Sequence, residues 1–255
     1  MKHLRTKQLI VVLCLAMIIL SHSLVVIASE TPINIVIVGD STASHYDNSR
    51  APRKGWAQTF QQFFTDQVVI KNHAASGRST KSFINEGRLT TALRDLKSGD
   101  YLFIQFGHND AKSDDPARYT EPFTTYKEHL KVYIDAAWEK GAHPILLTPV
   151  ERRGFNSDGT VKASHKQYPA AMIELAKELN VPVIDITSMS QALFYELGPE
   201  KTKDIFLWLE PGESPNYPDG VQDNTHFQEA GAIEIGKLVI QGLIELNHPL
   251  TQYLK

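Results

Sequence analysis

Apolar residues occur along this sequence in two patterns, which predict strands and helices in alternation. Short continuous runs rich in β-branched residues predict buried strands. These runs cover residues 33–38, 68–70, 101–106, 145–147 and 181–186. Apolar residues spaced three or four positions apart predict helices that bury one face. This spacing covers residues 56–64, 89–96, 123–140, 168–179 and 227–246.

Strands that are apolar at consecutive positions are typical of a parallel sheet covered by helices on both faces. We therefore expect an α/β fold. The sequence shows no internal repeat, no low-complexity linker and no break in composition, so we expect a single domain over residues 29–255. Two long segments, residues 152–166 and 210–224, separate predicted elements. Each is either a functional loop or a surface excursion.

The first 28 residues follow a different pattern. Three basic residues and no acidic one are followed by an apolar run over residues 9–20 and by small residues that end at Ala28. This order predicts a secretory signal peptide cleaved after Ala28, and therefore a secreted, extracellular protein. The alternative is an uncleaved membrane anchor, which requires about twenty apolar residues. Because Cys14 lies inside the apolar run, we do not expect a lipoprotein anchor.

The composition, with 42% hydrophobic and 22% charged residues, is that of a soluble globular protein. Removal of residues 1–28 leaves 227 residues, no cysteine and a net charge of −6. A thiol nucleophile and an intramolecular disulfide are therefore excluded from the mature chain. The negative charge gives no support for nucleic-acid binding. We expect a monomer with no membrane partner beyond the secretion signal.

Polar residues follow the predicted strands, and the carboxyl ends of parallel strands meet at one edge of a sheet, where ligands bind. The polar segments are residues 39–42, 72–80, 107–110 and 148–153, together with residues 223–226 before the last predicted helix. Any one of them alone is explained more simply as a turn or a helix cap. Together they contain the groups that acyl transfer needs.

In that interpretation Ser41 is the nucleophile, His226 accepts its proton and Asp223 orients the imidazole. The three-residue spacing allows Asp223 and His226 to share one turn. The oxyanion donors are the backbone N–H groups of Ser41 and Gly77 and the side-chain amide of Asn109. Gly77 suits this role because it has no side chain. The Gly-x-Ser-x-Gly motif of α/β-hydrolases is absent.

The order of these motifs resembles that of the SGNH, or GDSL-like, hydrolase family. The four blocks are Gly39-Asp40-Ser41, Gly77, Gly107-His108-Asn109-Asp110 and Asp223-x-x-His226. Within the family, the sequence is more similar to rhamnogalacturonan acetylesterases. That similarity rests on Gly55-Trp56, on residues 72–83 and on Thr148-Pro149-Val150-x-Arg152-Arg153. It extends over about residues 33 to 246.

The resemblance implies a three-layer, flavodoxin-like α/β/α fold with a central parallel sheet and no cofactor. It also implies hydrolysis of acetyl esters on pectic rhamnogalacturonan, an acetylated acidic plant polysaccharide. No metal is expected, because Asp223 and His226 supply only two ligands. The pair Thr42-Ala43 after the nucleophile argues against a lipid substrate. The alternatives are an acetylxylan esterase, a thioesterase, a lysophospholipase or a non-catalytic glycan-binding module.

An acidic protein needs local cations to bind an acidic polysaccharide, since long-range attraction does not help it. Two arginines, Arg78 and Arg152, belong to the polar segments at the expected catalytic edge. We expect one of them to contact a uronate carboxylate through paired hydrogen bonds. The alternative is that they pair with Asp40, Asp110 or Glu151 and shape the site.

Overall fold

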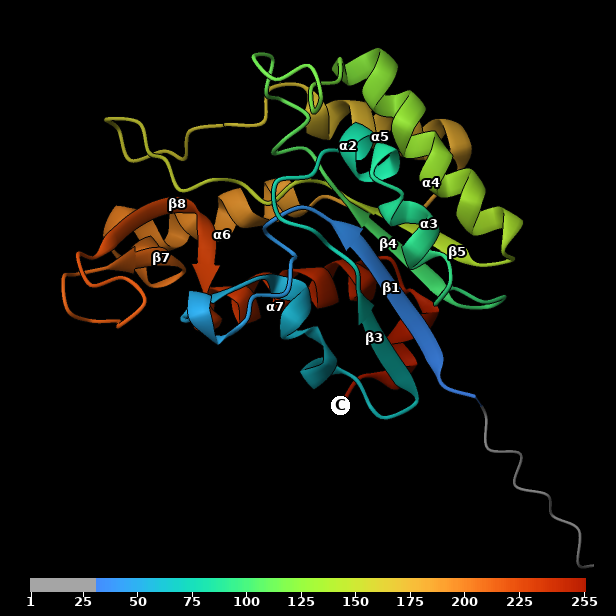
Figure 1. The fold of residues 1–255 in the computed structure, drawn as a ribbon, viewed down its shortest axis with the longest axis horizontal. Coiled ribbons are helices and arrows are strands. Elements are labelled where there is room, and N and C mark those ends of the chain that lie inside the picture. The colour runs from blue at the N-terminus through green and yellow to red at the C-terminus, as the bar shows by residue number, and fades with distance from the viewer. Residues whose placement is uncertain (1–30) are drawn as a thin grey trace, which may run out of the picture. The chain divides into compact units, whose positions relative to one another are not determined.

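The computed structural model describes residues 31–255, whose arrangement is shown in Figure 1. A sheet of five parallel strands has the spatial order β3-β1-β4-β5-β6. The strands are β1 (Ile33–Gly39), β3 (Val68–Asn72), β4 (Tyr101–Gln105), β5 (His143–Leu147) and β6 (Val183–Ile184). This sheet confirms the predicted α/β fold.

Helices cover both faces of the sheet and form two apolar cores, because successive side chains of a strand point to opposite faces. Ile35, Ile37 and Phe103 face the core beneath α6 (Ile186–Lys201) and α7 (Glu229–Glu245). The neighbouring positions face the opposite core. Its helices are α2 (Thr80–Asn85), α3 (Arg88–Ala92), α4 (Lys127–Glu139) and α5 (Tyr168–Leu179). The result is the expected three-layer arrangement (Figure 1).

The helix predicted over residues 56–64 is wrong. The segment forms two short 3₁₀ helices, η2 (Trp56–Gln58) and η3 (Phe60–Phe63), on either side of Thr59. Trp56 and Phe60 are fully buried, and their rings pack edge to face. The spacing of the aromatic residues therefore correctly indicated that they are buried. The segment that carries them forms 3₁₀ helices, not an α-helix.

Other boundaries differ in smaller ways. The helix predicted over 123–140 begins with a π-helical turn, η4 (Pro122–Tyr126), before α4. The strand predicted over 181–186 is shorter, because Asp185 caps the N-terminus of α6, a helix that the apolar pattern did not predict. The remaining short helices are η1 (Asn48–Arg50), η5 (Thr202–Asp204) and η6 (Pro249–Tyr253).

A second, antiparallel sheet was not predicted. Its order is β2-β8-β7, with β2 (Arg53–Lys54), β8 (Val221–Gln228) and β7 (Phe206–Leu209). Strand β8 is mostly polar, so it lacks the apolar run that marked the other strands. It occupies part of the segment assigned to a loop and to the start of the last helix, which begins at Glu229.

The predicted signal peptide lies outside the described residues. Within residues 31–255, no helix is both long enough and apolar enough to cross a membrane.

Candidate active site

Ser41 lies in the turn that follows β1, at the carboxyl edge of the parallel sheet. The chain turns there because Asp40 accepts hydrogen bonds from the backbone N–H and the hydroxyl of Thr42, both at 2.9 Å. Gly39 permits close approach of β4, since a Cβ at this position would lie 2.8 Å from the carbonyl oxygen of Gln105. The nucleophile expected from the sequence is thus held on a rigid turn.

His226 connects Ser41 to Asp223. Its Nε2 lies 2.8 Å from Ser41 Oγ, and its Nδ1 lies 2.6 Å from Asp223 Oδ2. The other carboxylate oxygen of Asp223 accepts the backbone N–H groups of Thr225 and His226. The three side chains expected to act together are therefore joined by hydrogen bonds.

The charges of this group suit a neutral base. Burial lowers the pKa of His226, and the hydrogen bond to Asp223 opposes this effect only in part. Burial alone would raise the pKa of Asp223. Its hydrogen bond and charge attraction to the His226 side chain, together with the backbone N–H groups of Thr225 and His226, outweigh burial and lower the pKa to about 2. An ionised Asp223 places the proton of the imidazole on Nδ1, which leaves Nε2 to accept the proton of Ser41.

A bulge in β8 brings His226 to Ser41. Phe206 and Leu207 are adjacent in β7, yet they pair with Phe227 and Asp223, so residues 224–226 of β8 have no partner in β7. Such a bulge redirects the side chains that it carries. Asp223 and His226 are close together, as their spacing predicted, but they lie in a strand bulge and not in a helix cap.

A cleft of about 330 Å³ lies over Ser41 and is lined by Gly77, Asn109 and His226 among others. Gly77 has φ +80, in the region that favours glycine, and an added Cβ would meet no atom within 4 Å. The need for glycine here is therefore one of backbone conformation and not of space, contrary to the expectation that its missing side chain makes room. Asn109 Nδ2 donates to the carbonyl of Arg78, which ties the Gly77 loop to the end of β4. The oxyanion role of these donors stays a prediction.

The two arginines expected to bind substrate differ in position. Arg78 forms an ion pair with Glu86 at 2.9 Å and donates to the carbonyl of Ser76, and it is not among the residues that line the cleft. Arg152 does line the cleft and donates to the hydroxyl of Thr225. Within residues 31–255 neither arginine forms the ion pairs with Asp40, Asp110 or Glu151 that were the alternative.

Three further cations line the cleft and were not identified from the sequence: Arg53, Lys112 and Arg118. Arg53 donates to the hydroxyl of Tyr46, which in turn donates to the carbonyl of Ser41. Arg53 comes from β2 of the unpredicted sheet, so no motif indicated its place. Lys112 and Arg118 follow Asn109 closely in the sequence, so their closeness to a predicted site residue could have identified them as cations of the cleft.

Across the described part of the chain, no group of three or more His, Cys, Asp or Glu side chains is arranged to hold a metal ion.

Residues 37–232 match the GDSL-like Lipase/Acylhydrolase family. The chain belongs to this family of carboxylic ester hydrolases, which confirms the resemblance of its motifs.

Within this family, the chain is similar to two rhamnogalacturonan acetylesterases, one of them named as probable. Rhamnogalacturonan acetylesterase RhgT of Bacillus subtilis (strain 168) is 48% identical over 225 residues, which cover 88% of this chain and 95% of RhgT. A probable rhamnogalacturonan acetylesterase of the same organism, YesY, is 42% identical over 86% of this chain and 96% of its own.

Solved structures agree on the fold. The crystal structure of protein YxiM from Bacillus subtilis matches with a TM-score of 0.72 at 29% identity, over 85% of this chain and 57% of that one. A catalytic mutant of Axe2, an acetylxylan esterase from Geobacillus stearothermophilus, matches with a TM-score of 0.58 at 13% identity. That match covers 83% of this chain and 94% of Axe2, and it shows the shared fold alone.

Proposed function

We propose that this protein removes acetyl groups from rhamnogalacturonan, an acidic polysaccharide of pectin, by a Ser-His-Asp mechanism with an acetyl-enzyme intermediate. The observation that carries the proposal is the hydrogen-bonded series Ser41, His226 and Asp223, of which Ser41 and His226 line a cleft. Two relatives with more than 40% identity, one named as a rhamnogalacturonan acetylesterase and one as a probable one, support the substrate.

The first half of the reaction forms the acetyl-enzyme. His226 Nε2 takes the hydroxyl proton as Ser41 Oγ bonds to the acetyl carbonyl carbon. The carbonyl π electrons move to oxygen, and this oxyanion is held by N–H donors of Ser41, Gly77 and Asn109. The C–O bond to the sugar then breaks, and the imidazolium returns its proton to the sugar oxygen that leaves.

The second half repeats these steps with water. His226 accepts a proton from water as the water oxygen attacks the acetyl carbon, and the collapse of the oxyanion breaks the bond to Ser41 Oγ. The proton returns to Ser41, and acetate leaves. In both halves the carboxylate of Asp223 stabilises the imidazolium that forms beside it.

The charge of the cleft supports an anionic substrate. Arg53, Lys112, Arg118 and Arg152 line it, and no Asp or Glu of the described residues does. Of these cations, within residues 31–255, only Arg118 has a carboxylate at ion-pair distance, that of Asp115 at 2.5 Å. Unpaired cations around a site in a chain of net charge −3 favour an anion near the reacting ester.

Acetate release from a panel of acetylated polysaccharides tests this proposal. Wild-type protein should release acetate from rhamnogalacturonan faster than from xylan or homogalacturonan, and Ser41→Ala should release none. Faster release from xylan would contradict the substrate, whereas an active Ser41→Ala would contradict the mechanism. A preference for long-chain over short-chain p-nitrophenyl esters would instead favour a lysophospholipase or thioesterase.

We also propose that the protein is secreted after cleavage behind Ala28. The basic start, apolar run and small residues of the N-terminus support this export. N-terminal sequencing of the protein from the culture medium should begin at Ser29. An intact N-terminus in the membrane fraction would contradict cleavage.

A further inference from the structure

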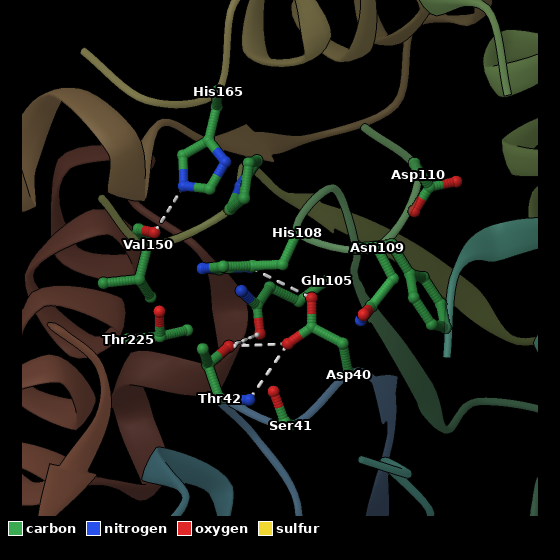
Figure 2. A network of polar contacts seen from close by, with 12 residues as sticks. Asp40, Ser41, Thr42, Gln105, His108, Asn109, Asp110, Val150, His165 and Thr225 are labelled. Carbon is green, nitrogen blue, oxygen red and sulfur yellow. Dashed lines mark hydrogen bonds and ion pairs between the residues drawn. The ribbon is translucent and has the colours of Figure 1, made fainter. Parts of the chain in front are cut away.

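A second Asp–His pair borders the same cleft. His108 Nδ1 lies 3.1 Å from Asp40 Oδ2, and His108 is one of the residues that line the cleft above Ser41. Figure 2 shows the pair beside Ser41; Asp40 follows β1 and His108 lies in the loop after β4. The proposed mechanism uses neither side chain, because Ser41 Oγ is bound by His226.

Asp40 fixes the tautomer of His108. The carboxylate is fully buried, and burial alone would raise its pKa. The attraction and hydrogen bond of His108, together with the hydrogen bonds from Thr42, outweigh burial and lower the pKa to about 2. An ionised Asp40 accepts the proton on Nδ1 of His108. Nε2 is therefore the nitrogen left for another partner.

Packing fixes the orientation of the ring. The imidazole of His165 meets that of His108 edge to face, with ring centroids 4.5 Å apart. His165 is itself held by a hydrogen bond of 2.7 Å between its Nε2 and the carbonyl of Val150 (Figure 2). His108 is thus held both through Nδ1 and across its ring, as a preorganised binding group needs to be.

Nε2 of His108 has no hydrogen-bond partner within residues 31–255. The side chain is only 3% exposed, yet Nε2 is not among the fully enclosed polar atoms that lack a partner in the described residues, so it is open to a ligand or water in the cleft. The cleft that His108 lines also contains Ser41 and Asn109, between which the ester carbonyl would lie. The substrate group that Nε2 meets is therefore close to the ester.

We propose that His108 Nε2 binds a free hydroxyl group of the sugar unit that carries the acetyl ester. This inference rests on the proposed function, since it requires a sugar ester in the cleft. A hydroxyl group both donates and accepts hydrogen bonds, so it suits the imidazole in either charge state. The contact would position the sugar and select esters that have a hydroxyl beside the acetyl group.

His108→Asn separates this role from a structural one. The side-chain amide of Asn can replace Nδ1 of His108 as the donor to Asp40, but the Asn side chain has no group in the place of Nε2. We expect kcat/KM for an acetylated sugar to fall about tenfold more than kcat/KM for p-nitrophenyl acetate, which has no sugar hydroxyl, with the difference mainly in KM. An equal loss on both substrates would indicate a structural role and overturn the proposal.

A deoxy substrate sharpens the test. Replacing the hydroxyl beside the acetyl group by hydrogen should lower kcat/KM of the wild-type protein about tenfold. On this deoxy sugar ester, His108→Asn should lower kcat/KM no more than it does on p-nitrophenyl acetate. Additive losses would overturn the contact.

His73 offers a matched control. Its Nε2 lies 2.8 Å from Asp95, and it does not line the cleft, so His73→Gln should change both substrates equally. Failure of wild-type protein to release acetate from any sugar ester would refute the proposed function. If the wild-type protein releases acetate from a sugar ester but His108→Asn lowers kcat/KM equally on the sugar ester and on p-nitrophenyl acetate, this inference alone is refuted.

Discussion

Two Asp–His pairs border one cleft, and they differ in burial and in what their Nε2 atoms face. The side chains of Asp223 and His226 are 25% and 18% exposed, whereas those of Asp40 and His108 are 0% and 3% exposed. His226 Nε2 contacts the hydroxyl of Ser41, but His108 Nε2 has no partner in residues 31–255. The same pairing therefore supports two roles. A base must reach the nucleophile, while a binding group must be held rigidly and left open to substrate.

The largest effects should follow from changes to Ser41 and His226. Ser41→Ala and His226→Ala each remove a group that the reaction passes through, so kcat for acetate release should fall by at least about 10⁴-fold. The melting temperature should stay within a few degrees of the wild type, which would show that the fold is intact. Substantial residual turnover by either variant would show that Ser41 and His226 are not the catalytic nucleophile and base.

Asp223→Asn should have a large but smaller effect. The amide no longer stabilises the imidazolium and allows the wrong tautomer, so we expect a loss of roughly 10³- to 10⁴-fold in kcat. Steady-state acetate release measures it. If Asp40→Asn reduced kcat more than Asp223→Asn did, the assignment of the two pairs would be reversed.

Asp40→Asn should lower stability as well as disturb the positioning of His108. The pKa of Asp40 is lowered from 3.8 to about 2, so its ionised form stabilises the fold above pH 3.8, and this contribution is lost as pH falls through 2. The difference is worth about 2 kcal/mol in the free energy of unfolding. Urea denaturation should show Asp40→Asn less stable at pH 7, with the gap narrowing below pH 3.8. A gap that does not depend on pH would argue against an ionised Asp40.

The two arginines predicted from the sequence should differ in effect. Arg152→Ala should lower kcat/KM about tenfold for acidic acetylated oligosaccharides and less for neutral ones, since a charge-assisted hydrogen bond would be lost. Arg78→Ala is the matched control, because Arg78 pairs with Glu86 outside the cleft lining. Equal losses on acidic and neutral substrates would exclude a carboxylate contact by Arg152.

The smallest expected effect is a shift in pH dependence. Because burial lowers the pKa of His226, the acid limb of kcat/KM should have its midpoint below pH 6.5. Asp223 favours the charged imidazole, so Asp223→Asn should move the limb to still lower pH in the residual activity. A shift toward higher pH would contradict the placement of Asp223 beside the base.

Much of the site was predictable because the parallel sheet brings distant segments together by rule. Ser41, Gly77 and Asn109 each follow one of its strands, and the carboxyl ends of those strands converge at one edge. Consecutive apolar residues identified the strands. Position along the chain was then enough to place these groups around one cleft.

The opposite wall of the cleft was not predictable in the same way. Strand β8 is polar, and the three-residue bulge that presents His226 depends on its pairing with β7. Arg53 belongs to β2, which pairs with β8. Arg78 follows Gly77 in the sequence, yet its side chain pairs with Glu86, because proximity to a loop does not determine the direction of a side chain.

The central claim is that His226 activates Ser41 as the nucleophile. Treatment with a fluorophosphonate, followed by peptide mass spectrometry, tests it most directly, because such reagents form a covalent adduct with an activated serine. The adduct should lie on the peptide that contains Ser41, be absent from Ser41→Ala and form far more slowly in His226→Ala. Inactivation with the adduct on another residue, or equal labelling of Ser41 in His226→Ala, would contradict the account.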